Sequence, residues 1–409
     1  MARILLPGTL DTKGEEYSFV HELILARGHE ALVMDLGVLG APRLRPDIAS
    51  SDVAEAGGMS LEELRARQDR GKAVDVMLAG GRHLTRDLYD AGEFEGVLGL
   101  GGGGGTTMIT ALMRELPVGV PKVMVSTMAS GNTAPYVDVK DITMMYSVVD
   151  IAGLNPLSRR ILANAVGAIC GMLEQPKPNA EASRPLIAAT MFGVTTACVT
   201  EARKRLEAAG YEVLVFHATG SGGRAMEGLV SDGYFAGVLD VTTTEWCDEV
   251  VGGVLTAGPD RLSAAAAKGI PQVVSVGALD MVNFGPYETV PERFRSRLLY
   301  RHNATVTLMR SSEMECGEVG RMIAAQLNRA KGPVVLMLPL KGVSMIDAEG
   351  QPFYNPAANA ALFASLRSNV GPNVRVRELD LHINDPDFAH ALADELLALL
   401  ARENALHHA

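Results

Sequence analysis

The sequence predicts an α/β protein made of two Rossmann-like, doubly wound parallel-sheet domains that arose by internal duplication. Short apolar runs alternate with helical patterns along the chain of 409 residues, an order that favours parallel sheets covered by helices. A glycine-rich stretch joins one of these runs to the next helix. The sequence of strand, loop and helix in the first half returns in the second half.

The glycine-rich stretch follows the apolar run 96–100 and precedes a helical pattern over 108–116. A run of five glycines costs backbone entropy, which favours a role that needs close approach to the backbone. The free N–H groups of a strand-to-helix turn point at one place, so the stretch predicts a phosphate or anion site. A tight structural turn is the alternative. The residues predicted to bind the anion are Gly101, Gly102, Gly103, Gly104, Gly105, Thr106 and Thr107.

Several familiar signatures are absent from the sequence. The glycine run matches the dinucleotide fingerprint G-x-G-x-x-G by construction, and the next strand, 123–126, carries no acid to bind a ribose. No lysine follows the glycines as in a Walker A loop. The patterns G-x-S-x-G, H-E-x-x-H and C-x-x-C do not occur, which disfavours serine hydrolases and zinc proteases.

The composition of the chain indicates its cellular location and the classes of partner that it lacks. The net charge of −11 argues against a nucleic-acid-binding surface. Four widely spaced cysteines match no disulfide framework or zinc site, as in a reduced cytoplasmic protein. The N-terminus leads directly into a predicted strand and shows no signal-peptide pattern. The sequence contains no apolar run of 18 residues, so it predicts no membrane span. We therefore expect a cytoplasmic protein without membrane or nucleic-acid partners.

The first domain is expected at 1–174. Its predicted strands are 3–6, 31–36, 96–100 and 122–126. The predicted helices begin at residue 15 after a turn-rich loop, at Ser60 with a capping box, and at 108 and 156. Residues 37–60 read as a loop, and 74–79 as either a short strand or a continued helix. The proline-rich segment 175–185 predicts a linker.

The second domain, 186–409, repeats this order. Strand 186–190 corresponds to 3–6, Gly210 to the helix-ending Gly28, 235–241 to 94–100, and 269–275 to 119–125. Further strands are predicted at 211–216, 334–338 and 374–379, and helices at 355–366 and 386–401. The alternative is two independent Rossmann-like domains that share only the general βα pattern.

The loop after the first strand carries polar groups suited to a phosphate. Lys13 can balance phosphate charge, Asp11 can hold Mg²⁺ through oxygen, and Thr9 and Thr12 can donate hydroxyl groups. The alternative is an N-capped loop with a solvated lysine. Ligands bind beyond the carboxyl ends of parallel strands, so the cleft between the two domains is the expected site.

The second domain offers further candidates at strand ends. Gly222, Gly223 and Arg224 form a second glycine loop with an arginine that can bind an anion, and His217 can act as acid, base or ligand. Asp240 and Glu245 could bind a metal or a polyhydroxylated ligand, or cap a helix. We take His217, Asp240, Glu245 and Asp280 as the catalytic candidates.

These loops, in this order, resemble the ATP-binding family whose best-known member is the N-terminal domain of the tomato mosaic virus resistance protein. The resemblance covers essentially the whole chain and rests on 8–15, 101–107, 141–155, 191–196, 216–224, 242–246, 278–285 and 382–386. It implies two Rossmann-like subdomains, nucleotide binding and a homodimer.

The expected function is that of a cytoplasmic ATP-binding protein, an enzyme of small-molecule metabolism with an unknown second ligand. The ATP phosphates would lie on the glycine loop, with Lys13 and Mg²⁺ nearby. Two alternatives remain at this point. One is a non-catalytic regulator that responds to nucleotide, and the other is a sugar-acid or acyl-phosphate enzyme whose loops bind substrate instead of ATP.

Overall fold

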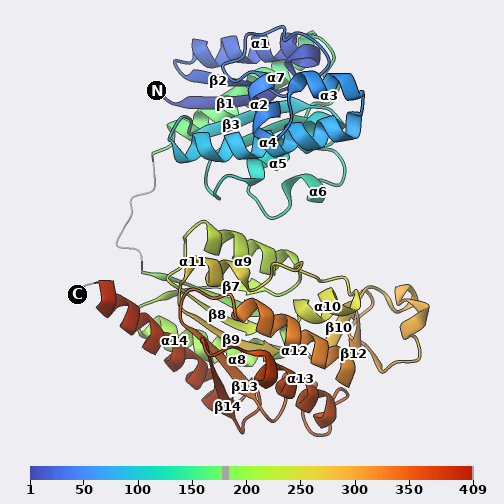
Figure 1. Ribbon diagram of the computed structural model, residues 1–409, viewed down its shortest axis with the longest axis vertical. Coiled ribbons are helices and arrows are strands. Elements are labelled where there is room, and N and C mark those ends of the chain that lie inside the picture. Colours follow the sequence, from blue (N-terminus) through green and yellow to red (C-terminus); the bar gives the residue numbers. More distant parts are fainter. Residues whose placement is uncertain (177–183, 408–409) are drawn as a thin grey trace. The chain divides into compact units, whose positions relative to one another are not determined.

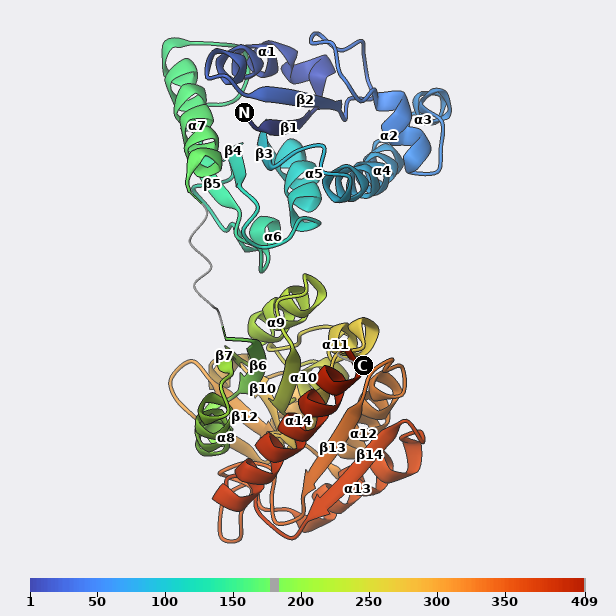
Figure 2. The same ribbon diagram turned by 90° about the vertical axis from the view of Figure 1, so that its left-hand side faces the viewer.

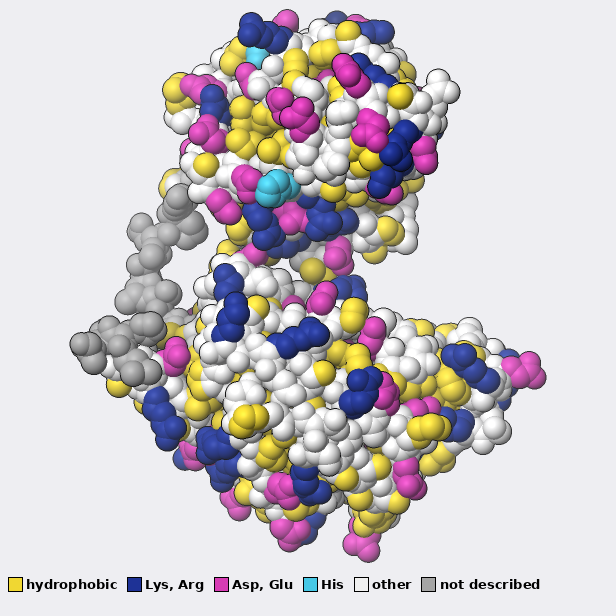
Figure 3. Space-filling model, in the orientation of Figure 1, with side chains coloured by type: hydrophobic (Ala, Val, Ile, Leu, Met, Phe, Trp, Pro, Cys, Tyr) yellow, Lys and Arg dark blue, Asp and Glu magenta, His cyan; other side chains and the backbone are white. Residues whose placement is uncertain are grey.

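The computed structural model describes residues 1–176 and 184–407 and divides into two compact units, Met1–Asn179 and Ala180–Ala409 (Figure 1). Each unit contains its own parallel sheet. Most of the predicted linker, residues 177–183, lies outside the described residues. On the face drawn in Figure 3, basic and acidic side chains are interspersed over each unit.

The first unit has a five-stranded sheet in the order β2-β1-β3-β4-β5, with all strand pairs parallel. Figure 2 shows α1 and α7 on one face and α4 and α5 on the other. Each face has its own apolar core cluster. The elements in chain order are β1 (Arg3–Gly8), α1 (Leu10–Ala26), β2 (Glu30–Asp35), α2 (Ser50–Ala56), α3 (Leu61–Arg67), α4 (Arg70–Asp90), β3 (Gly96–Gly101), α5 (Gly103–Arg114), β4 (Lys122–Ser126), α6 (Ala134–Val137), β5 (Thr143–Tyr146) and α7 (Pro156–Glu174).

The second unit has a six-stranded parallel sheet in the order β14-β13-β9-β8-β6-β7 and a small antiparallel sheet, β10-β12-β11. Its elements in chain order are β6 (Leu186–Met191), α8 (Thr196–Ala208), β7 (Glu212–His217), α9 (Ser221–Ser231), β8 (Gly237–Thr242), α10 (Glu245–Val251), α11 (Ser263–Lys268), β9 (Gln272–Gly277), β10 (Met281–Phe284), β11 (Leu299–Arg301), β12 (Thr307–Arg310), α12 (Glu313–Leu327), β13 (Val334–Pro339), α13 (Pro356–Asn369), β14 (Val374–Leu379) and α14 (Pro386–His407).

The two parallel sheets share one topology. Counted within its own unit, each sheet has the strand order 2-1-3-4-5, and the second unit adds a sixth strand. This order is doubly wound, with the winding direction changing between the first and third strands. The predicted α/β fold with two Rossmann-like sheets is therefore confirmed, and the shared order is the result that a duplication would produce. The loops after β1 and β3, and after β6 and β8, flank the two switch points.

Residues 74–79, for which a short strand and a continued helix were the two alternatives, belong to the long helix α4. The prediction of a loop at 37–60 was wrong in part, because α2 lies inside that segment. Short apolar runs do not distinguish a strand from a buried helix, which explains the first ambiguity. Helix α1 begins at Leu10, five residues earlier than predicted, but its backbone departs from helical geometry at Lys13. The small antiparallel sheet had no counterpart in the sequence-based description.

Candidate functional site

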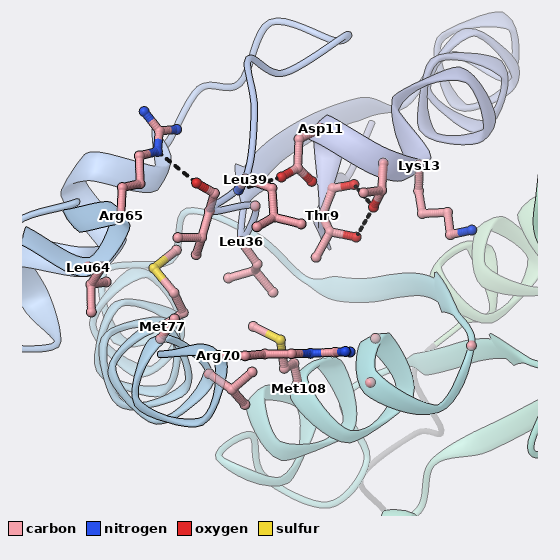
Figure 4. A pocket seen from close by; sticks show the side chains of 18 of the residues that line it. Thr9, Asp11, Lys13, Leu36, Leu39, Leu64, Arg65, Arg70, Met77 and Met108 are labelled. Carbon is pink, nitrogen blue, oxygen red and sulfur yellow. Dashed lines mark hydrogen bonds between the residues drawn. The ribbon is translucent and has the colours of Figure 1, made fainter. Parts of the chain in front are cut away.

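A cavity of about 740 Å³ opens in the first unit at the carboxyl ends of β1, β2 and β3 (Figure 4). Sites for small molecules typically have volumes of about 300–1,000 Å³. The cavity lies at the switch point of the sheet, where doubly wound folds bind their ligands. Its walls come from the loops after these strands and from α1, α3, α4 and α5. The lining residues are Thr9, Asp11, Thr12, Lys13, Leu36, Gly37, Val38, Leu39, Leu64, Arg65, Gln68, Asp69, Arg70, Ala73, Val74, Met77, Gly102, Gly103, Gly104, Gly105 and Met108.

The first turn of α5 forms one end of the cavity. Among the described residues, none accepts a hydrogen bond from the backbone N–H groups of Gly103, Gly104 or Gly105. The first N–H groups of any helix lack partners within the helix, and they carry the positive end of its dipole. The turn therefore has the hydrogen-bond donors and the charge that an anion would require.

The glycines in this turn are not all required by the fold. A Cβ on Gly101 would lie 2.9 Å from the Cα of Gly105, so that glycine is needed for packing. A Cβ on Gly103 would come no closer than 3.9 Å to Met128, and one on Gly104 would meet nothing within 4 Å. Neither residue has a positive φ. Glycine costs up to about 1 kcal/mol relative to alanine in a helix, so these two positions point to a ligand that needs the space.

Two basic side chains lie at the same end of the cavity. Arg70 extends toward the first turn of α5 in Figure 4, and none of the described residues hydrogen-bonds to its guanidinium. Arg70 is the first residue of α4, where a cation faces the positive end of the helix dipole. Its position is therefore unfavourable for the helix itself. Lys13 lies nearby, and its Nζ donates a hydrogen bond to the carbonyl oxygen of Ile151.

The other end of the cavity is apolar. Leu36, Leu64 and Met77 are buried side chains there, and Met108 lies on the floor between the two ends. Figure 4 shows Leu39 across the cavity from Met108, with its side chain pointing inward. The cavity thus combines an end with basic side chains and free backbone N–H groups with an apolar end, which suits a ligand with a charged head and an apolar body.

Asp11 supports a loop instead of presenting a free carboxylate. Its Oδ2 accepts hydrogen bonds from the N–H groups of Leu39 at 2.9 Å and Gly40 at 3.2 Å. Its Oδ1 is buried without a hydrogen-bond partner and faces Gly37. The hydroxyl oxygens of Thr9 and Thr12 lie 2.9 Å apart and bond to each other. Within residues 1–176 and 184–407, no group of three metal-ligating side chains is arranged to hold a metal ion.

The second glycine loop is closed by the protein itself. A Cβ on Gly222 would lie 1.9 Å from the carbonyl oxygen of His217, and one on Gly223 would lie 2.3 Å from Glu245 Oε2. The fold therefore requires both glycines. Glu245 Oε1 accepts hydrogen bonds from the N–H groups of Gly220 at 2.7 Å and Gly223 at 3.1 Å. Arg224 donates to the carbonyl oxygen of Thr256 at 3.2 Å.

Asp240 and Glu245 take part in a buried ion network. Arg261 is 1% exposed and donates to Asp240 Oδ2 at 2.5 Å, to Glu245 Oε2 at 2.7 Å and to Glu227 Oε1 at 3.1 Å. Burial is the main cause of the raised pKa of Glu227. Asp240 and Glu245, both predicted to be catalytic, are thus paired with the buried Arg261 of the protein itself.

The remaining catalytic candidates lie apart from this network. His217 is exposed at the end of β7, and its ring centroid lies 5.3 Å from that of Phe192. Asp280 is fully buried and accepts a hydrogen bond from Ser344 Oγ at 2.7 Å. Burial, together with the nearby Asp347 carboxylate, raises the pKa of Asp280 to about 7. All four catalytic candidates belong to the second unit, and none lines the cavity.

Sequence reasoning missed Arg70, which lines the cavity, and the buried contact of Tyr17 between two strands. Arg70 could have been noticed as a cation just after the N-cap Asp69. Tyr17 is buried, and its hydroxyl donates to the carbonyl oxygen of Pro7 and accepts from the N–H of Leu100 at 3.1 Å. Burial is the main cause of its raised pKa. Tyr17 thus joins the ends of β1 and β3, a contact between distant segments that leaves no local pattern.

Fold and site together define a two-unit Rossmann-like protein with a small-molecule cavity in its first unit. The chain belongs to an uncharacterised protein family, UPF0261. The model of the family's N-terminal domain matches residues 2–178, and that of its C-terminal domain matches 184–400. Among the described residues, no helix combines the length and apolar character needed to cross a membrane.

Relatives of known sequence include a UPF0261 protein of Clostridium tetani, 55% identical over 98% of this chain and 99% of that protein. The ToMV resistance protein Tm-1(GCR237) of Solanum lycopersicum is 44% identical over 86% of this chain. The match covers 48% of the tomato protein, about half its length. The solved structure of E. coli ADP-heptose lps heptosyltransferase II matches 98% of this chain and 99% of that chain at 13% identity with a TM-score of 0.22, too weak a likeness to indicate function.

Proposed function

We propose that the first unit binds ATP, with the phosphates on the first turn of α5. The observation that carries the proposal is the pair Gly103 and Gly104. Both have room for a side chain, neither has a positive φ, and both line the cavity. A phosphate in contact with the N–H groups of this turn would explain why glycine stands at both positions.

Charge supports the same assignment. Arg70 extends toward the turn, and Lys13 lies at the same end of the cavity (Figure 4). A bound triphosphate would complement both cations and the positive end of the α5 dipole. The cost of placing Arg70 in the first turn of α4 would then be offset by the ligand.

The apolar end suits the nucleoside. Leu36, Leu64 and Met77 make this end of the cavity apolar, and pockets of this kind fix the orientation of a ligand with few polar groups. The choice of ATP among nucleotides follows the resemblance of the sequence to the ATP-binding family. A cytoplasmic location, a homodimer and a second small-molecule ligand belong to the same proposal.

Mg²⁺ would enter with the phosphates, since it commonly keeps several waters and takes few protein ligands. Two acids line the cavity, and both accept hydrogen bonds from the backbone: Asp11 from Leu39 and Gly40, and Asp69 from Lys72. A nucleotide-responsive binder with slow turnover therefore fits this cavity better than a fast ATPase, which needs a group that positions water.

Calorimetric titration with ATP and Mg²⁺ tests the proposal in the wild type and in Gly104→Asp. An aspartate in the first turn favours the helix, so the variant should fold while its carboxylate repels the phosphates. We expect saturable binding by the wild type and loss of at least tenfold in affinity in the variant. Gly193→Asp adds the same charge at an exposed glycine of the second unit where a Cβ meets nothing within 4 Å, and it should bind normally. Absence of ATP binding by the wild type would refute the proposal.

A further inference from the structure

Leu39 is an apolar side chain in an exposed position at the cavity. It is 88% exposed, yet it points into the cavity and not outward from the protein (Figure 4). Opposite it lies Met108, which is 6% exposed. Both side chains line the cavity, so a ligand group between them would meet apolar surface on two sides.

Two side chains hold the main chain on either side of Leu39. From α1, Asp11 Oδ2 accepts hydrogen bonds from the N–H groups of Leu39 and Gly40. From α3, Arg65 Nε donates to the carbonyl oxygen of Val38 at 2.7 Å, and one of its terminal nitrogens donates to that of Gly40 at 3.3 Å. The segment 38–40 is therefore fixed from two helices before any ligand arrives.

This fixation needs an explanation because Leu39 contributes little to the core. An exposed leucine gains stability only when another apolar surface covers it. Pre-organising such a side chain reduces the entropy lost when a ligand binds. The hydrogen bonds from Asp11 and Arg65 to this segment are explained if a ligand supplies the apolar surface that covers Leu39.

Resting on the proposed function, we infer that Leu39 packs on the nucleotide base, with Met108 on the opposite side. Asp11 and Arg65 are positioning residues that hold Leu39 over the base. The phosphates then bind at the glycine turn, and the base is recognised by apolar contact with Leu39 and Met108. Asp11 serves this site through the backbone of the 38–40 segment and not as a ligand of Mg²⁺.

Leu39→Ala tests the inference, with ATP and inorganic triphosphate as separate ligands in calorimetry. Inorganic triphosphate probes the glycine turn alone, because it has no base. We expect ATP to bind the variant about tenfold more weakly, and triphosphate to bind it as it binds the wild type. Because Leu39 is exposed, the variant should fold normally. Leu39→Met, which restores an apolar side chain, should recover most of the ATP affinity.

The two proposals fail in different ways. If the wild type binds ATP and Leu39→Ala binds it equally well, the inference about Leu39 is overturned while ATP binding stands. Equal weakening of ATP and triphosphate would also overturn it, because the effect would then lie at the phosphates. If the wild type binds no ATP, the proposed function fails, and this inference fails with it.

Two variants at Asp11 distinguish a residue that positions Leu39 from a residue that binds Mg²⁺. The amide oxygen of Asp11→Asn can still accept hydrogen bonds from Leu39 and Gly40, but it is a poorer ligand for Mg²⁺. We expect Asp11→Asn to keep its ATP affinity within about threefold and its Mg²⁺ dependence unchanged, and Asp11→Ala to lose about tenfold. Loss of Mg²⁺ dependence in Asp11→Asn would overturn the positioning role.

Discussion

Glu245 caps the N-terminus of α9 through Gly223, whose backbone N–H donates to the Glu245 carboxylate at 3.1 Å. The same oxygen accepts from Gly220 at 2.7 Å. The second unit therefore supplies its own anion to a glycine-rich helix start. At α5 in the first unit, no carboxylate among the described residues fills the corresponding place. This difference directs the search for a phosphate site to the first unit.

Replacing Glu245 with alanine should destabilise the second unit and leave ATP binding unchanged. The substitution removes one partner of the buried Arg261, and breaking a buried ion pair costs about 3–5 kcal/mol. The fluorescence of Trp246, which is buried beside Glu245, monitors the unfolding of this unit in urea. Glu292→Ala, at an exposed position of the same unit, should change stability by less than about 0.5 kcal/mol. A stable Glu245→Ala variant with impaired ATP binding would move the site to the second unit.

Removal of the Arg70 charge should weaken ATP binding without harming the fold. Hydrogen bonds to charged groups contribute about 1.5–3 kcal/mol, so Arg70→Met should bind ATP roughly 10- to 100-fold more weakly. Its thermal stability should stay equal or rise, because the cation no longer opposes the α4 dipole. Lys72→Met is the matched control, since Lys72 lies in the same turn but does not line the cavity. Equal effects of both variants on calorimetric affinity would argue against a specific contact.

Replacing Gly104 with alanine should raise the stability of the protein and lower its affinity for ATP. A Cβ at this position meets nothing within 4 Å, so Gly104→Ala should stabilise the protein by up to about 1 kcal/mol while its methyl group obstructs the phosphates. Gly171 lies in α7 with equal space for a Cβ, and Gly171→Ala should raise stability without changing affinity. Thermal denaturation and ATP titration of both variants check this. Unchanged affinity in Gly104→Ala would show that the turn does not contact the ligand.

The second unit should lose stability as pH rises toward 8. Burial raises the pKa of Asp248 from 3.8 to about 7. Because the folded state holds this proton more tightly than the unfolded chain, the stabilisation is complete below about pH 4 and is lost as pH passes through about 7. The unfolding free energy should therefore fall between pH 5 and 8, by up to about 1.4 kcal/mol per pH unit for this group.

Urea denaturation at both pH values, again through Trp246, measures this fall. Asp248→Asn cannot ionise and should reduce it, while part should persist because the pKa of Asp280 is raised as well. The same pH dependence in Asp248→Asn and the wild type would assign the fall to other groups.

The parts of the fold that could be predicted are those that depend on patterns among residues close in sequence. The buried strands of both sheets and the glycine turn followed from apolar runs and from residues 101–105, and the sheet order confirmed the doubly wound fold. The roles of Asp11 and Glu245 could not be predicted in this way. Their partners, Leu39 and Arg261, are brought to them by tertiary packing, so a carboxylate at a strand end looks the same whether it binds a ligand or the protein's own backbone.

Hydrogen–deuterium exchange with and without ATP tests the central claim most directly. If the phosphates bind the first turn of α5, amides in the peptide that contains Gly103–Arg114 should exchange more slowly with ATP present. The α9 turn, which Glu245 already caps, should be unaffected. Slower exchange at α9 or α10, with none at α5, would contradict the account and place the nucleotide in the second unit.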